Sequence, residues 1–193
     1  MSDDVEEREV SPPPADWVSQ LLAFWFDEHG QSDWFGGGSA FDAAVSDRFV
    51  GWRDALRGQP VVAFMADAET ALAAIILFDQ VPRNAFRGTA EAFATDHIAL
   101  AIARRAVEAD LDDGLDNDKR LFLYMPFEHS EDLDDQRESV RLMSMLGDER
   151  LLQFALDHQD LIERFGRFPH RNMALGRANR KGEAEAVAAG SHW

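Results

Sequence analysis

Residues 148–166, with the sequence DERLLQFALDHQDLIERFG, indicate the fold class most clearly. Their apolar side chains recur at the spacing of one helix face: Leu151, Leu152, Ala155, Ile162 and Phe165. Asp148 is a favoured N-cap residue, because its side chain can accept a hydrogen bond from a free backbone N–H of the first turn. Gly166 is typical of a helix end, since glycine adopts the left-handed conformation without strain. The stretch therefore predicts one complete helix.

The same signals recur along most of the chain. Asp67, Asp116 and Ser130 are expected to cap further helices, because all three are favoured N-cap types. Pro82 and Pro126 are expected to end two helices, since proline disfavours helix in the residue before it. No segment shows the alternation of apolar and polar residues that is typical of a strand. We therefore predict an all-α single domain of about seven or eight helices with short connections.

The expected domain organisation has three parts. Residues 1–13 are acidic and aperiodic, and we expect a disordered amino terminus there. Residues 14–180 are expected to form the helical domain, with a glycine-containing loop over 31–38, and residues 181–193 a loose tail. A length of 193 residues suits one domain with a sizeable core.

Composition excludes several classes of function. The formal net charge is -17, so nucleic acid and anionic membranes are poor partners for the chain as a whole. There is no cysteine, which excludes disulfides, thiol nucleophiles and sulfur-based metal sites. No apolar run approaches the ~20 residues of a membrane helix, and we expect a cytoplasmic protein. No metal-ligand spacing or phosphate-binding loop occurs, so neither a metal nor a cofactor is predicted.

Charge is distributed unevenly between the two ends of the chain. Residues 161–193 carry a net charge of +3, whereas residues 1–160 carry -20. The arginines near the carboxyl end, together with those after Pro82, have two interpretations. They neutralise carboxylates within the fold, or some of them converge on a small anion, which the planar guanidinium binds through two hydrogen bonds at once.

Three polar segments follow apolar helices, and each contains a proline between aromatic and charged residues. They are residues 78–88 (FDQVPRNAFRG), 124–132 (YMPFEHSED) and 165–172 (FGRFPHRN). This interleaving suggests polar side chains that are partly buried rather than a solvated surface. His129 and His170 lie in two of these segments and are candidates for acid–base chemistry, or for capping and packing. His158 lies among apolar residues and is expected to be a core histidine bonded to the backbone.

These segments resemble a bacterial family catalogued as domain of unknown function 924. The resemblance extends to residues 23–26 (AFWF), 34–35 (WF), 93–96 (FATD) and 120–123 (RLFL), and covers about residues 16–177. It implies an all-helical, tetratricopeptide-like array of helical hairpins, and it implies no activity. It also suggests that the polar segments are the family's own motifs.

Our leading hypothesis is an enzyme or binding protein for a small anionic molecule. Its expected catalytic residues are His129, His170 and Glu131. Its expected substrate-binding residues are Asp79, Gln80, Arg83, Asn84, Arg87, Arg167, Arg171 and Asn172. One alternative is a helical interaction module that binds a partner peptide, with the polar segments joining its helices. Another is a structural or regulatory subunit that forms a homodimer through Trp17, Trp25 or Trp34.

Overall fold

The computed structural model describes residues 12–36 and 38–190, and that part of the chain is all-helical, as predicted. Its elements are α1 (Trp17–Leu22), η1 (Ala23–Glu28), α2 (Gln31–Gly36), α3 (Ser39–Leu56), η2 (Val61–Phe64), α4 (Ala68–Ile75), η3 (Ile76–Gln80), α5 (Val81–Ala85), η4 (Ala90–Phe93), α6 (Asp96–Glu108), α7 (Asn117–Glu128), α8 (Leu133–Ser144), α9 (Glu149–Phe165), η5 (Pro169–Arg171) and α10 (Glu183–Ala188). Residues 1–11 of the expected disordered terminus and 191–193 of the expected tail lie outside the described residues.

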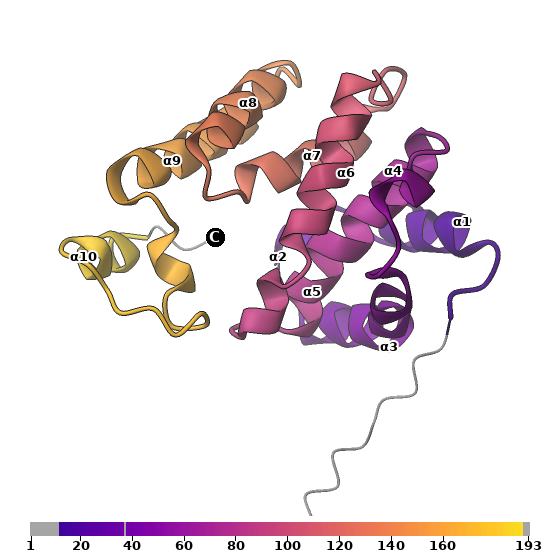
Figure 1. Cartoon of the computed structure of the whole chain (residues 1–193), viewed down its shortest axis with the longest axis horizontal. Helices are drawn as coiled ribbons and strands as arrows, with labels where there is room; N and C mark the ends of the chain where they lie inside the picture. The colour runs from indigo at the N-terminus through magenta and orange to yellow at the C-terminus, as the bar shows by residue number, and fades with distance from the viewer. Residues whose placement is uncertain (1–11, 37, 191–193) are drawn as a thin grey trace, which may run out of the picture.

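Helices that are close in the chain are also close in space. Figure 1 shows α8 and α9 side by side at one end of the molecule, with α7 packed against α8. Toward the other end, α4 packs against α6 and α1, and α3 packs against α5. α10 lies below α9 in this view and contacts η5. The end of α7 and the segment after α9 both approach η3 and the start of α6, which brings distant parts of the sequence together.

The core consists of two hydrophobic clusters. The larger one unites apolar side chains from α1 to α9, and Trp25, Phe49 and Phe78 are fully buried in it. Full burial excludes Trp25 from any contact at the protein surface. The smaller cluster is formed by Leu161, Ile162, Phe168 and Ala186, with Leu133 and Phe165 packed against it. The segment after α9 is therefore attached through a small apolar core of its own.

The helix starts follow the short-range signals in the sequence. Asp67, Asp116 and Asp148 are N-caps, and each side chain accepts a backbone hydrogen bond within 2.7–2.9 Å. α9 ends at Gly166, whose φ of 66° is left-handed. The prediction for Ser130 was wrong, because Asp132 caps α8 and the Ser130 hydroxyl donates to Asp135 instead.

Neither proline ends a helix, which corrects the prediction. Pro126 lies inside α7, which continues to Glu128. Pro82 lies in the first turn of α5, and the carbonyl of Phe78, which its missing N–H leaves without a backbone donor, accepts from the Thr95 hydroxyl instead. The chain reaches it through the π-helical turn η3 rather than through a break.

Two segments expected to be irregular contain helices. Residues 31–36 form α2 within the expected loop. The expected loose tail contains α10, and its first residue, Glu183, is fully buried. No helix among the described residues has both the length and the apolar character needed to cross a membrane.

Candidate functional site

The π-helical turn η3 positions the first functional side chain, Asp79. Pro82 cannot donate the usual backbone hydrogen bond to the carbonyl of Phe78, four residues before it. The hydroxyl of Thr95 donates to that carbonyl instead, at 2.6 Å. The side chain of Arg83 donates to the next carbonyl, that of Asp79, also at 2.6 Å. Side chains thus complete the backbone hydrogen bonding here and tie the start of α6 to η3.

Asp79 is a fully paired buried carboxylate. It accepts hydrogen bonds from Nε2 of Gln80 at 2.6 Å and from Nδ1 of His129 at 2.8 Å, and Nη1 of Arg83 lies 3.1 Å away. Burial alone would raise its pKa, but the charge of Arg83 and the contact with His129 outweigh burial. The pKa of Asp79 therefore lies well below its ordinary value, and the group is ionised at neutral pH.

His129 follows the last residue of α7 and is largely buried. Burial lowers the pKa of its imidazole, the charge of Arg83 lowers it further, and Asp79 offsets this only in part. The ring is therefore neutral at neutral pH. Because a carboxylate can only accept a hydrogen bond, Nδ1 carries the proton that is donated to Asp79. Nε2 then carries a lone pair, which is the arrangement of a general base.

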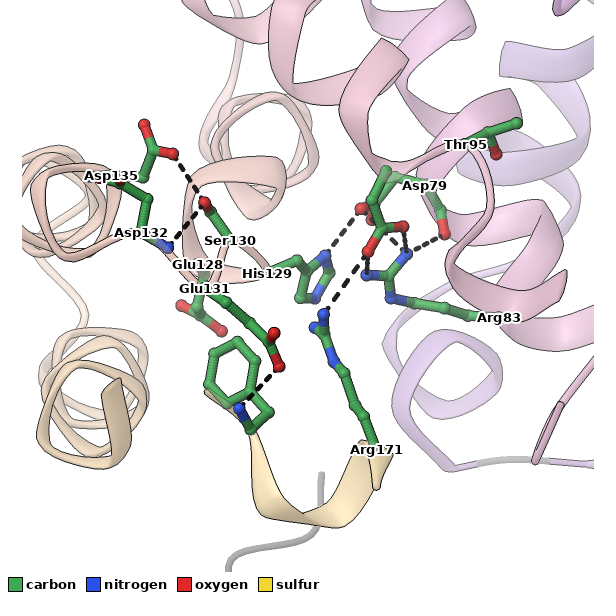
Figure 2. Close-up of polar contacts among 12 residues, drawn as sticks. Asp79, Arg83, Thr95, Glu128, His129, Ser130, Glu131, Asp132, Asp135 and Arg171 are labelled. Atoms are coloured by element: carbon green, nitrogen blue, oxygen red, sulfur yellow. Dashed lines mark hydrogen bonds and ion pairs between the residues drawn. The ribbon is translucent and has the colours of Figure 1, made fainter. Parts of the chain in front are cut away.

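Two arginines meet at Asp96, the first residue of α6. Arg83 makes a bidentate pair with it, at 2.9 Å for both contacts. Nη1 of Arg171, from η5, lies 3.7 Å from the same carboxylate. Figure 2 shows Arg171 rising from η5, at the bottom of the view, toward Asp79 and Arg83. Asp96 therefore lies between two guanidinium groups, and it is hydrogen-bonded to that of Arg83 and more distant from that of Arg171.

Arg171 has few polar partners for a buried cation. Phe93 and Phe168 lie 4.7 and 4.5 Å from its guanidinium carbon, measured to the ring centres. Its Nε is buried and makes no hydrogen bond to any described residue. Burial lowers the pKa of Arg171 to about 10, and the charge of Arg83 adds to this effect. The cation is thus held by ring faces and lacks a close carboxylate of its own.

Glu128 and His158 form the inner part of the site. His158 is a core histidine, as expected, and its Nδ1 lies 2.8 Å from the carbonyl of Phe154 and 3.7 Å from Oε1 of Glu128. Burial lowers the pKa of His158 to about 3. Burial raises the pKa of Glu128 to about 8, and the charge of Asp79 adds to the rise. The ring centre of His170 lies 5.5 Å from that of Phe168. The charge of His170 contributes slightly to lowering the pKa of His158.

A second polar centre, around Glu183, contains other residues that we expected in the site. Glu183 accepts hydrogen bonds from Nε and Nη2 of Arg167, from Asn172 and from the backbone of Arg180, all within 2.6–2.9 Å. Glu131 accepts two hydrogen bonds from Arg177 and one from the backbone of Phe168. Arg167, Asn172 and Glu131 therefore fasten the segment that carries η5 instead of contacting His129.

Of the remaining expected residues, one lies away from His129 at the surface and the other lies close to Asp79. Arg87 is exposed and pairs with Asp42 on α3, away from His129. Asn84 donates to the carbonyl of Gln80 and so supports the turn that holds Asp79. The contacts thus unite Asp79, Gln80, Arg83, His129 and Arg171 with Asp96. Among the described residues, no group of three histidine, aspartate or glutamate side chains is arranged to hold a metal ion.

Three side chains of the site were not predicted as members in their own right: the carboxyl group of Glu128 and the rings of Phe93 and Phe168. Both phenylalanines lie within the quoted motifs, and for Phe168 its position between Arg167 and Arg171 was the available signal. Glu128 gave a weaker signal, because a glutamate beside a histidine is usually exposed.

Comparison with known proteins places these features in a family. The model of a bacterial protein family of unknown function, DUF924, matches residues 21–191. A solved structure of a protein of unknown function from Agrobacterium tumefaciens is 38% identical, with a TM-score of 0.85, over 91% of this chain and 99% of that one. No curated protein matches the chain.

Proposed function

Since the chain belongs to the bacterial family DUF924, whose function is unknown, its chemistry must be inferred from the site, and we propose that it is an enzyme acting on a small anionic substrate. In this proposal His129 is the general base, Asp79 holds its imidazole, and Arg171 binds the anionic group. One observation carries it: a neutral imidazole is paired with a buried carboxylate beside a guanidinium that lacks a close partner.

The base step depends on the pairing of His129 with Asp79. The carboxylate fixes the tautomer, so that Nε2 has the lone pair, and it stabilises the imidazolium that forms when Nε2 takes a proton. The lowered pKa of His129 keeps the ring neutral, and therefore competent as a base, at neutral pH. A general base in this position contributes roughly 10²–10⁴ to a rate.

The anion step depends on the difference between the two central arginines. Arg83 already donates to Asp96 and to the carbonyl of Asp79, so we assign it a positioning role. Arg171 has only the 3.7 Å contact with Asp96, and a carboxylate or phosphate group would supply the close partner that it lacks. The substrate would then lie between Arg171 and Nε2 of His129.

The reaction class that suits these groups is hydrolysis or elimination, in which the base takes a proton from water or from the substrate. His170 keeps a place in the proposal as a second proton-exchanging group, because its ring packs against Phe168, whose ring also lies against the guanidinium of Arg171. Arg87, Arg167, Asn172 and Glu131 support the fold in this proposal and do not bind substrate.

Nitrogen NMR of the histidine rings tests the proposal without a known substrate. At pH 7 we expect His129 to carry its proton on Nδ1 and none on Nε2. Sulfate, used as a probe anion, should shift the Nε2 resonance of His129 in a saturable way, and Arg171→Met should abolish that shift. The matched control is His97→Gln, which removes an exposed imidazole from α6 and should leave the sulfate response intact.

Activity is then measured on a mixture of anionic metabolites followed by mass spectrometry. We expect the wild type to consume at least one compound and His129→Gln to do so at least 100-fold more slowly, with little change in melting temperature. A protein that binds no sulfate and consumes no compound contradicts the proposal. That result would favour the interaction-module interpretation, in which a tetratricopeptide-like array binds a peptide.

A further inference from the structure

Glu128 is the least well paired acid in the interior. The residue is 7% exposed, and its carboxyl group makes no hydrogen bond to any of the described residues. Nδ1 of His158 lies 3.7 Å from Oε1 of Glu128, which is beyond hydrogen-bond distance. That nitrogen lies 2.8 Å from the carbonyl of Phe154, so its proton is already donated elsewhere.

Burial without a partner determines the charge of Glu128. An ionised carboxylate in an apolar interior is far more costly than a neutral carboxylic acid, and such a group keeps its proton. The charge of Arg83 is already paired with two other carboxylates, those of Asp79 and Asp96. Glu128 is therefore a neutral acid that contributes no bond to the fold, in contrast to Glu183.

Several contacts and charge effects place Glu128 against the same site. It directly precedes His129 in the last turn of α7, and the charge of Asp79 acts on its carboxyl group. His158 lies 3.7 Å from Glu128, and the charges of His129 and Arg171 contribute to lowering its pKa. Figure 2 shows Glu128 on the side of His129 away from Asp79, with Glu131 between Glu128 and Arg171 in this view. The buried acid and the proposed base are therefore neighbours at the end of α7.

We propose that Glu128 is the proton donor to the anionic substrate held between His129 and Arg171. This inference rests on the proposed function, to which it adds the acid. In an elimination, Nε2 of His129 would take the proton from a substrate C–H bond while Glu128 protonates the departing hydroxyl, which leaves as water. In a hydrolysis, His129 would take a proton from the attacking water and Glu128 would protonate the departing oxygen. The proton on His129 then returns to Glu128 through solvent, so none is gained or lost in a turnover.

The test follows the side-chain carboxyl carbons of glutamate by carbon NMR, with and without saturating sulfate. Glu128→Gln identifies the resonance by its disappearance. Glu128→Asp provides a second identification should the first variant fail to fold. In the wild type we expect Glu128 to stay protonated at pH 6.5 and to titrate near pH 8. Sulfate should move this titration to still higher pH, because the bound anion accepts the Glu128 proton in a hydrogen bond. The Arg171→Met variant should show no such shift.

The outcomes separate this inference from the proposed function. A Glu128 resonance that titrates like an ordinary exposed glutamate overturns the inference. So does a sulfate response at His129 without any response at Glu128, and that result leaves the proposed function standing. Absence of a response at both residues overturns the proposed function and the inference with it. The matched control is Glu108→Gln at the exposed end of α6, which should leave both sulfate responses unchanged.

Discussion

The short helix η5 joins two polar centres that are built from the same kinds of side chain and differ in how completely they are paired. Around Glu183, one buried carboxylate accepts hydrogen bonds from Arg167, Asn172 and the backbone of Arg180. Around His129, Glu128 makes no hydrogen bond to the described residues, and Arg171 has only a contact of 3.7 Å with a carboxylate.

This difference in pairing distinguishes a structural centre from a centre that is suited to bind a ligand. A buried ionic network with all of its groups paired is a rigid joint, because each group has already exchanged water for a protein partner. Groups left short of partners destabilise the empty protein and can improve their pairing only when a ligand arrives. The Glu183 centre therefore fastens the segment that carries η5, whereas the His129 centre binds the substrate in the function that we propose.

The largest stability effect is expected when the paired centre is broken. Glu183→Ala removes four hydrogen bonds and leaves the guanidinium of Arg167 without its carboxylate. Since removing one partner of a buried ion pair is strongly destabilising, we expect the melting temperature to fall by roughly 10 °C. Glu185→Ala, on the exposed side of α10, is the control and should change it by less than about 2 °C. A fall of similar size in both variants would show that α10 is not docked through Glu183.

Asp79→Asn is expected to have a smaller effect on stability and a larger one on activity. The amide cannot hold His129 as a carboxylate does, so we expect a change of tautomer in nitrogen NMR and at least about a 100-fold loss of metabolite consumption. The melting temperature at pH 7 should fall by roughly 5 °C.

Because the pKa of Asp79 is lowered in the fold, its contribution to stability is present above about pH 4 and is lost as the pH falls below that. The variant should therefore lose less stability on acidification than the wild type, and an equal loss would contradict this account.

Glu128→Gln should change the pH dependence of stability at the alkaline end, whereas Asp79→Asn changes it at the acidic end. The pKa of Glu128 is raised to about 8 in the fold, so its favourable contribution is complete below about pH 4 and is lost as the pH rises through 8. Melting curves at pH 5 and pH 9 should therefore show a decline for the wild type that is smaller for the variant. Glu108→Gln, at an exposed position, should decline as the wild type does. Equal slopes for all three proteins would mean that Glu128 is not a buried acid.

The smallest effect is expected at Arg87. It is exposed and pairs with Asp42 at the surface, and such pairs contribute little. Arg87→Ala should leave the melting temperature nearly unchanged and should keep the sulfate response of His129. Loss of that response would place Arg87 in the anion site after all.

Short-range signals in the sequence predicted much of the fold. Asp67, Asp116 and Asp148 cap helices through contacts made within three residues, so the pattern alone was enough. Pro82 was misread because its consequence depends on a distant partner. Its helix continues on a π-helical turn whose free carbonyl is satisfied by Thr95.

The site was predictable as a set of segments but not as a set of contacts. Arg87 and Arg171 lie in equally polar surroundings in the sequence, and only the contacts that Arg171 makes with Phe93 and Asp96, far away in the chain, distinguish the buried one from the exposed one. Glu131 lies two residues after His129, yet it pairs with Arg177 and the backbone of Phe168, because α7 has already ended at Glu128 and helical spacing no longer relates the two side chains. Which side chains pair with one another depends on partners from other elements, and periodicity and capping rules do not predict those partners.

The position of η5 near the carboxyl end also has a consequence for synthesis. A chain emerges from the ribosome with its amino end first, so Asp79, Asp96 and His129 can come together while Arg171 is still inside the exit tunnel. The large hydrophobic cluster needs no residue beyond α9. In the proposed function, His129 would then be held in place before Arg171 has emerged, and completion of η5 would add the group that binds the anion.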